Sequence, residues 1–180
     1  MRLTFGYSFS TWRFHLRGIP ITGAHDVGWI ADLTVERAMR SDPVIVPAYT
    51  SLLKLREIAP LGSAKRVFIV DNNERYLGIV YMATVHDPDI TDAAASLVAG
   101  DLARGAGMCL QPKENLRVAL ARFETVEMET LPVLNNMQEM QVVGYLTEAY
   151  ALRRYTQELE RQRSSETGTI SPFPLGPTKA

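Results

Sequence analysis

The sequence predicts an α+β fold made of two copies of one β-α-β-β-α unit, packed as a pseudo-two-fold pair. The stretch LTVERAMRSDPVIV, which begins at Leu33, aligns with LVAGDLARGAGMCL, which begins at Leu97, at an offset of 64 residues. Apolar runs and turn residues then recur in the same order after both stretches. One such unit leaves a sheet face that it cannot bury alone, so pairing two units gives each face a partner.

Each copy is expected to begin with a short apolar strand and a helix. The strands are predicted at Val44–Val46 and Met108–Leu110, and each is followed by a turn that contains Pro47 or Pro112. Apolar residues at helical spacing then predict a helix in each copy. These residues are Leu52, Leu55, Ile58 and Ala59 in the first copy and Leu116, Ala119, Leu120 and Phe123 in the second.

A hairpin and a second helix are expected to complete each copy. The turns hold DNN at 71–73 and NN at 135–136, and these residues tolerate left-handed backbone conformations. Gly78 matches Gly144 at an offset of 66 residues, so the second hairpin loop carries a two-residue insertion. The expected strands lie at 67–70 and 76–82 in the first copy and at 131–134 and 142–147 in the second.

The flanks differ in kind from the two copies. Near the start, Phe5, Phe9 and Trp12 form a short amphipathic stripe at i, i+4 and i+7. From Thr147 a helix is expected through EAYALRRYTQELERQR, and the Ser-, Thr-, Gly- and Pro-rich segment from Ser164 is expected to be disordered. The expected domain bounds are a juxtamembrane-like linker at 1–32, repeats at 33–96 and 97–160, and a disordered tail at 161–180.

Composition and charge argue against several classes of protein. The chain is 46% hydrophobic and 22% charged, as in an ordinary globular domain, and its formal net charge of -1 gives no general attraction to nucleic acid. The single cysteine, Cys109, excludes an intrachain disulfide and a thiolate zinc cluster, and it indicates a reducing compartment. No apolar run approaches the roughly 18 residues that a transmembrane helix needs. A signal-peptide core is interrupted by Arg2, Arg13, His15 and Arg17.

The two copies, each with a glycine in its returning strand, resemble a pair of CBS domains, a module that commonly binds adenine nucleotides between its repeats. Three segments narrow the resemblance to the cytosolic C-terminal region of bacterial CLC-type chloride channels and transporters. They are GYSFSTWRFHLRG (6–18), AHDVGWIADLTVERAMR (24–40) and GYLTEAYALRRYTQELE (144–160). The resemblance covers roughly residues 5–160. It implies a regulatory module on the cytoplasmic face of the inner membrane, whose membrane part is absent from this chain.

The resemblance also implies partners and a mechanism. CBS pairs and CLC proteins dimerise, so a homodimer is expected, with contacts from Ile58 and Leu61 or from Val118 and Phe123 unless these residues are core. Dimer packing would bias the pore through the 1–32 linker as a domain-rotation switch. The aromatic stripe of that linker suits a membrane edge or packing on the domain, and both readings stay open. A free-standing CBS sensor that regulates another enzyme or transporter in trans is the alternative.

Nucleotide binding depends on a short motif that many nucleotide-binding CBS repeats share: glycine, two apolar residues, Ser or Thr, two further residues, and Asp. In such repeats the hydroxyl reaches a phosphate and the carboxylate accepts hydrogen bonds from the ribose. Here the first copy has Tyr81 and Thr84 at these two positions, and the second has Thr147 and Tyr150. Both acids are missing, which predicts a degenerate or empty cleft.

Two basic residues favour binding. Lys65 and Arg66 precede a strand near the cleft and are either phosphate partners or a solvated surface pair. No cofactor is required, and ATP, ADP or AMP are the candidate regulatory ligands. The candidate cleft residues are Thr147, Tyr150, Tyr81, Thr84, Lys65 and Arg66.

The sequence offers no catalytic set and no metal site. Cys109 lies in an apolar predicted strand, which favours a buried, inert thiol. The cluster HDPD at 86–89 with Asp92 matches no calcium loop, so it predicts a turn and a helix cap. There is no glycine-rich phosphate loop and no nucleophile elbow. The chain is therefore predicted not to be an enzyme.

Overall fold

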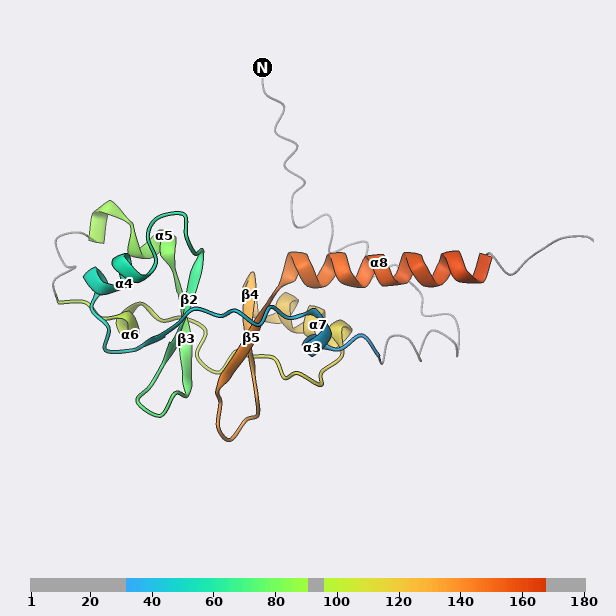
Figure 1. Cartoon of the computed structure of the whole chain (residues 1–180), viewed down its shortest axis with the longest axis horizontal. Helices are drawn as coiled ribbons and strands as arrows, with labels where there is room; N and C mark the ends of the chain where they lie inside the picture. Colours follow the sequence, from blue (N-terminus) through green and yellow to red (C-terminus); the bar gives the residue numbers. More distant parts are fainter. Residues whose placement is uncertain (1–31, 91–95, 168–180) are drawn as a thin grey trace, which may run out of the picture. The chain divides into compact units, whose positions relative to one another are not determined.

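The computed structural model describes residues 32–90 and 96–167, and from Leu33 on the described residues form one compact unit. The predictions made for the linker, for Asp92 and for residues 168–180 lie outside the described residues. The predicted α+β class is confirmed (Figure 1). The helices are α3 (Val35–Ala38), α4 (Leu52–Ile58), α5 (Met82–Val85), α6 (Ala99–Leu102), α7 (Leu116–Val126) and α8 (Glu148–Thr167), with a 3-10 turn at Pro88–Ile90. The strands are β1 (Ile45–Pro47), β2 (Arg66–Val70), β3 (Tyr76–Tyr81), β4 (Thr130–Leu134) and β5 (Val142–Thr147).

The internal duplication is visible in the strand register. In the first copy β2 pairs in parallel with β1 and antiparallel with β3, and in the second copy β4 and β5 form the matching hairpin. Ile69 lies opposite Gly78, and Val133 lies opposite Gly144. Each hairpin has a register shift at the residue that follows, Val70 or Leu134. The 64- and 66-residue offsets therefore relate structurally equivalent positions.

The prediction of a strand at Met108–Leu110, at the start of the second copy, is wrong. The structure has only a single parallel bridge there, between Leu110 and Val133. Two prolines explain the loss. In the first copy, ladder bonds run from the Phe68 amide to the Val44 carbonyl and from the Ala48 amide to the Val70 carbonyl. The residues equivalent to these two donors are Pro132 and Pro112, which have no amide hydrogen.

The leading segment of each copy, before its first strand, pairs with the other copy. Arg40 exchanges backbone hydrogen bonds with Tyr145, at 2.9 and 3.0 Å, and its equivalent Arg104 exchanges them with Ile79, at 2.9 and 2.8 Å. Short helices repeat the pattern, because α3 contacts α7 and α6 contacts β1 and β3. The repeats are therefore held together by reciprocal crossing of their leading segments.

This crossing explains the two equivalent glycines. A Cβ atom on Gly144 would lie 2.5 Å from the Arg40 carbonyl oxygen, and one on Gly78 would lie 2.9 Å from the Arg104 carbonyl oxygen. Both distances are shorter than van der Waals contact, so only glycine lets the backbones approach this closely.

The core extends across both copies. One cluster of buried residues joins β1, β2, β3 and α4 of the first copy to Ala99 of α6. A second cluster joins the two hairpins to each other, and Phe68, Ile79 and Leu134 are among its members. In Figure 1, α4, α5 and α6 lie beside the first sheet, whereas α3 and α7 lie beside the second. Burial of the apolar faces between these layers is the main stabilising term.

The helices follow their predicted positions, with differences at some ends and faces. The Ser51 hydroxyl caps α4 and the Asn115 side chain caps α7, each by accepting a backbone amide hydrogen. Phe123 is core, whereas Ile58 is 44% exposed and therefore not part of the buried face of α4. Helix α8 continues to Thr167, so residues 161–167, assigned to the disordered tail by the predicted bounds, are helical.

Candidate functional site

A pocket of about 450 Å³ opens where the first copy meets β5 and α8 of the second. The leading segment before β1, the start of β2, and the junction between β5 and α8 all contribute to its walls. Its lining residues are Arg40, Asp42, Val44, Ser63, Ala64, Lys65, Arg66, Phe68, Tyr145, Thr147, Ala149, Tyr150 and Arg153.

The junction between β5 and α8 places a helix N-terminus at the pocket. The Thr147 hydroxyl accepts a hydrogen bond from the Tyr150 amide at 3.3 Å, which caps the first turn of α8. Ala149 and Tyr150, in that first turn, line the pocket. The amides and the dipole of a helix N-terminus favour an anion, so this end of α8 adds to the positive character of the wall.

The charged residues of the pocket are mostly cationic. Four cations, Arg40, Lys65, Arg66 and Arg153, face one carboxylate, Asp42, a formal net charge of +3. In the described part of the chain, none of these cations forms an ion pair with a carboxylate. Uncompensated cations around a concave surface concentrate anionic ligands there.

Aromatic rings hold two of the arginines in place. The Arg66 guanidinium lies 5.5 Å from the centre of the Tyr145 ring, and the Arg153 guanidinium lies 5.3 Å from the centre of the Tyr150 ring. The Tyr145 ring also packs against Phe68, with ring centres 5.6 Å apart. The Nε atom of Arg66 is buried and has no hydrogen-bond partner. A buried donor without a partner is costly.

The structure brings together four of the six predicted site residues. Lys65, Arg66, Thr147 and Tyr150 all line the pocket. Tyr81 does not line it and instead lies opposite Arg66 in the β2–β3 register. Burial raises the pKa of Tyr81, the positive charge of Arg66 opposes this shift, and the negative charge of Glu129 adds to it.

Thr84 is the other predicted residue outside the pocket. It lies in the short helix α5, where its carbonyl oxygen accepts hydrogen bonds from the amides of His86 and Asp87. Thr84 was predicted from the glycine motif of the first copy, and it does not line the pocket described above.

Sequence reasoning missed several wall residues. Arg153 follows Tyr150 by three positions on a helix, and this spacing was the signal that could have found it. Arg40 and Asp42 carried no local signal, because they reach the second copy only through the crossing of the leading segment. Asp42 is the only carboxylate among the pocket's lining residues.

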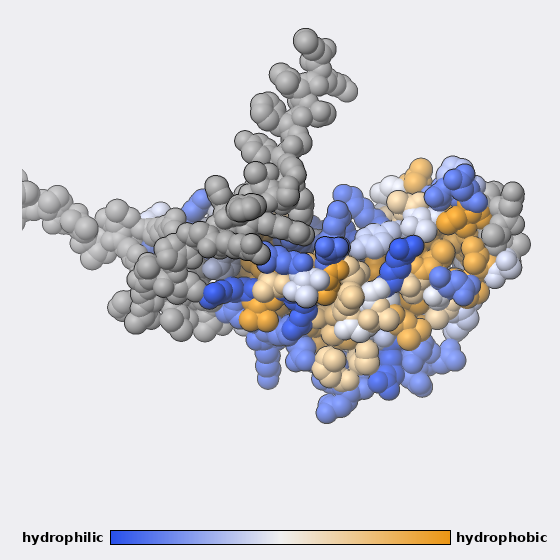
Figure 2. Space-filling view, turned by 180° about the vertical axis from the view of Figure 1, so that it is seen from behind, coloured by the Kyte–Doolittle hydropathy of each residue, from blue (hydrophilic) through white to orange (hydrophobic). Residues whose placement is uncertain are grey.

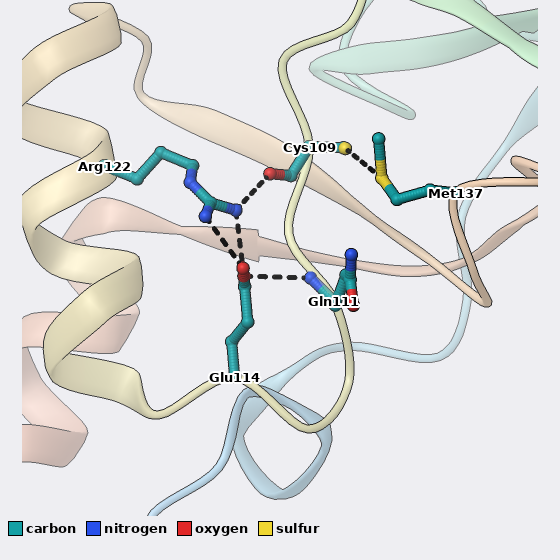
Figure 3. Close-up of polar contacts among 5 residues, drawn as sticks. All are labelled: Cys109, Gln111, Glu114, Arg122 and Met137. Carbon is teal, nitrogen blue, oxygen red and sulfur yellow. Dashed lines mark hydrogen bonds and ion pairs between the residues drawn. The ribbon is translucent and has the colours of Figure 1, made fainter.

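Cys109 belongs to a network of polar contacts (Figure 3) and does not line the pocket. The Arg122 guanidinium donates to the Cys109 carbonyl oxygen at 2.7 Å and forms an ion pair with Glu114, at 2.7 and 2.9 Å. Glu114 also accepts the Gln111 amide hydrogen at 3.0 Å. Burial raises the pKa of the Cys109 thiol, while Arg122 opposes this shift and Glu114 adds to it. The buried, neutral thiol fits the predicted inert role.

The HDPD cluster forms a turn. The Asp87 carboxylate accepts the Asp89 amide hydrogen at 3.0 Å at the start of the 3-10 turn, and a His86 ring nitrogen lies 3.1 Å from the Ala59 carbonyl oxygen. Across residues 32–90 and 96–167 there is no group of three or more His, Cys, Asp or Glu side chains suited to a metal ion. None of the helices in these ranges is long and apolar enough to span a bilayer.

Comparisons with known proteins agree with the observed fold. The sequence profile described as the CBS domain matches residues 31–86. The structure of the CBS-pair protein CBSX2 from Arabidopsis thaliana is similar at 20% identity with a TM-score of 0.58, over 71% of this chain and 97% of that one. The complex of CBSX2 with AMP is similar at 19% identity with a TM-score of 0.54, over 72% and 97%.

A transport protein has a similar domain. The CBS domain of a bacterial CNNM/CorC family Mg²⁺ transporter, in complex with ATP, is 11% identical with a TM-score of 0.59, over 73% of this chain and 93% of that one. No curated protein matches the sequence. The profile match, these structural similarities and the duplicated hairpin register show that the described part of the chain has the fold of a CBS-domain pair.

Proposed function

We propose that this chain is a non-catalytic regulatory module that binds an adenine nucleotide in the pocket between its two CBS repeats. One observation carries the proposal: the pocket joins an unpaired cationic wall to aromatic rings. The cations suit the phosphates, and the Tyr145 and Tyr150 rings offer surfaces on which a purine base can stack. Similar CBS proteins complexed with AMP and with ATP support this class of ligand.

The missing ribose-binding acids shape this proposal. Tyr150 stands where the resemblance implies an aspartate, and the lone wall carboxylate, Asp42, comes from the opposite copy. Asp42 is exposed, so it can accept hydrogen bonds from ribose hydroxyls only at the mouth of the pocket. We therefore expect the phosphates to supply most of the affinity, and the affinity to be modest.

The parent protein proposed for the module is a CLC-type chloride channel or exchanger, with the module at the cytoplasmic face of the inner membrane. The three flanking sequence segments support this assignment. In this arrangement a ligand that bridges the two repeats changes dimer packing, and the 1–32 linker carries the change to the pore. A free-standing CBS sensor that acts in trans has the same fold, and similarity to the CBS-pair protein CBSX2 favours it equally.

The proposed homodimer would use exposed apolar residues of α4 and of the turn that follows. Leu53 is 57% exposed, Ile58 44% and Leu61 79%. Figure 2 shows hydrophobic residues gathered on the surface at the end of the molecule that the first repeat forms. Helices of CBS pairs are expected to dimerise through such faces, and a two-fold contact would cover both copies of this one.

Titration calorimetry of the full chain with ATP, ADP and AMP at near-millimolar concentrations tests the proposed function. Saturable heat with the wild-type chain, lost in Arg66→Gln, is the expected result, because Arg66 is one of the cations that line the pocket. Arg117→Gln is the matched control, since Arg117 is exposed on α7 and does not line the pocket. Absence of heat with all three nucleotides would leave a dimer-forming module with no nucleotide site.

A further inference from the structure

The internal repeat gives the pocket a pseudo-symmetric counterpart, and the two are chemically different. Applying the 64-residue offset to the basic pair of the pocket maps Lys65 onto Glu129 and Arg66 onto Thr130. The hairpin registers confirm the mapping, because Arg66 lies opposite Tyr81 and Thr130 lies opposite Thr147. Where one cleft has two cations, the equivalent positions of the other have a carboxylate and a hydroxyl.

The counterpart also carries a larger side chain. Ala64, which lines the pocket, maps onto Met128. Met128 packs on the cluster that joins the two hairpins, and a Cβ atom on Gly105 would lie 2.7 Å from its terminal methyl carbon. The Tyr76 hydroxyl donates to the carbonyl oxygen of the same glycine, Gly105, at 3.2 Å. A methionine adapts well to an irregular space of this kind.

Burial follows the same asymmetry. Arg66 is half-buried beside the pocket, whereas Thr130 is fully buried and its hydroxyl has no hydrogen-bond partner. Tyr81, the partner of Arg66 in the sheet, lies within the electrostatic reach of Glu129. A phosphate placed on the Glu129 side would therefore meet a negative charge where the pocket offers Lys65.

We infer that each chain binds one polyphosphate ligand, in the Arg66 cleft only: Lys65 attracts phosphate to this cleft, whereas Glu129 repels phosphate and Met128 obstructs it at the equivalent cleft. This inference rests on the proposed nucleotide-binding function and adds its stoichiometry and its selectivity. The ligand is chosen by phosphate charge, so affinity rises from AMP to ADP to ATP, inorganic tripolyphosphate competes with ATP, and adenosine does not.

A pair of opposite charge reversals at equivalent positions tests the inference. Calorimetry of the full wild-type chain with ATP and with tripolyphosphate, at physiological ionic strength, is expected to give one site per chain. Lys65→Glu is expected to weaken both ligands by about tenfold or more, since it replaces an attraction to phosphate with a repulsion. Glu129→Lys is the matched control: Glu129 is exposed and does not line the pocket, and Met128 stays in place in the equivalent cleft, so we expect one site per chain and a change in affinity below about threefold.

The outcomes separate the inference from the function on which it rests. Two ATP sites per chain, an equal effect of the two reversals, or competition by adenosine would overturn the one-cleft inference and leave nucleotide binding intact. No binding of ATP, ADP or AMP to the wild-type chain would remove the proposed ligand itself. Lys65 is exposed, so its variant should fold, and Lys65→Gln with an intermediate loss of affinity provides a second measurement.

Discussion

Arg40 and Tyr145 exchange two backbone hydrogen bonds: the Arg40 amide donates to the Tyr145 carbonyl oxygen at 2.9 Å, and the Tyr145 amide donates back at 3.0 Å. This bridge ties the segment before the first repeat to the last strand of the second. It also brings the Arg40 side chain to the same pocket as Tyr145. The Arg40–Tyr145 bridge therefore both joins the two repeats and places two residues in the wall of the pocket.

The bridge predicts a large cost for a single added methyl group. Gly144→Ala would place a Cβ atom 2.5 Å from the Arg40 carbonyl oxygen and 2.9 Å from the Met39 sulfur, so the crossing segment must move. We expect a loss of about 1–3 kcal/mol in the free energy of unfolding, measured by urea denaturation. Val143→Ala, at an exposed neighbouring position, is the control. Equal stability of Gly144→Ala and the wild-type chain would contradict the tight crossing.

The network around Glu114 and Arg122 predicts a second stability difference. Arg122→Met removes an ion pair and a hydrogen bond to the Cys109 carbonyl oxygen, in the segment where prolines have removed the strand ladder. We expect the free energy of unfolding to fall by roughly 1–2 kcal/mol, because the partly buried Glu114 carboxylate and Cys109 carbonyl lose the hydrogen bonds that Arg122 donates. Denaturant midpoints with unchanged slopes would provide the measurement.

An exposed ion pair supplies the comparison for Arg122. Lys54 pairs with Glu57 at 2.9 Å on the surface of α4, and this contact raises the pKa of Lys54. Exposed pairs contribute little to stability. Lys54→Met is therefore expected to unfold at the wild-type denaturant concentration, and an equal loss in both variants would show that the Arg122 network has no special role.

Much of the fold follows from the sequence because its signals are local. The turn residues at 71–73 and the apolar run of β2 act over a few neighbours, and the register of both hairpins agrees with them. The reciprocal crossing pairs Arg40 with Tyr145, 105 positions away, and Arg104 with Ile79, 25 positions away, and no local propensity encodes such pairings. The prolines at 112 and 132 do carry a local signal, but it acts on a partner strand distant in sequence.

The site was predictable to the extent that its residues belong to a motif. Thr147 and Tyr150 lie at the glycine motif, and Lys65 and Arg66 lie at a strand start, so sequence spacing indicates them. The choice between the two clefts was only partly predictable: the charge difference between Lys65 and Glu129 can be read from the sequence, but the position of Met128 beside Gly105 is a matter of tertiary packing. Side-chain volume in a shared core is decided by all its neighbours together.

A buried tyrosine predicts alkaline destabilisation. Burial raises the pKa of Tyr76 well above its usual value, and the neighbouring Cys109 and Tyr81 add to the shift. The folded state keeps the phenol neutral, whereas the unfolded state ionises near pH 10. The stabilisation is therefore fully present below about pH 10 and is lost as pH rises above that value.

Tyr76→Phe checks this pH dependence. The variant loses the hydrogen bond to the Gly105 carbonyl oxygen, so at pH 7 we expect it to be less stable by about 1 kcal/mol. Between pH 9 and about 11 its free energy of unfolding should fall less than that of the wild-type chain. Urea titrations across this range provide the comparison, and identical slopes against pH would show that Tyr76 does not contribute.

The exposed apolar residues of the first repeat predict the oligomeric state. Ile58→Glu combined with Leu61→Glu places two carboxylates on the proposed two-fold contact, where each would lie near its own symmetry mate and lose water. We expect sedimentation equilibrium to give twice the chain mass of 20.1 kDa for the wild-type chain and a single chain mass for the variant. Met137→Glu, on the β4–β5 turn and 53% exposed, should remain dimeric. If the wild-type chain is a monomer, dimer packing has no part in the proposed mechanism. If the variant stays dimeric, the dimer contact does not use this surface of α4. Val118 of α7, which is 50% exposed, is then the next position to change.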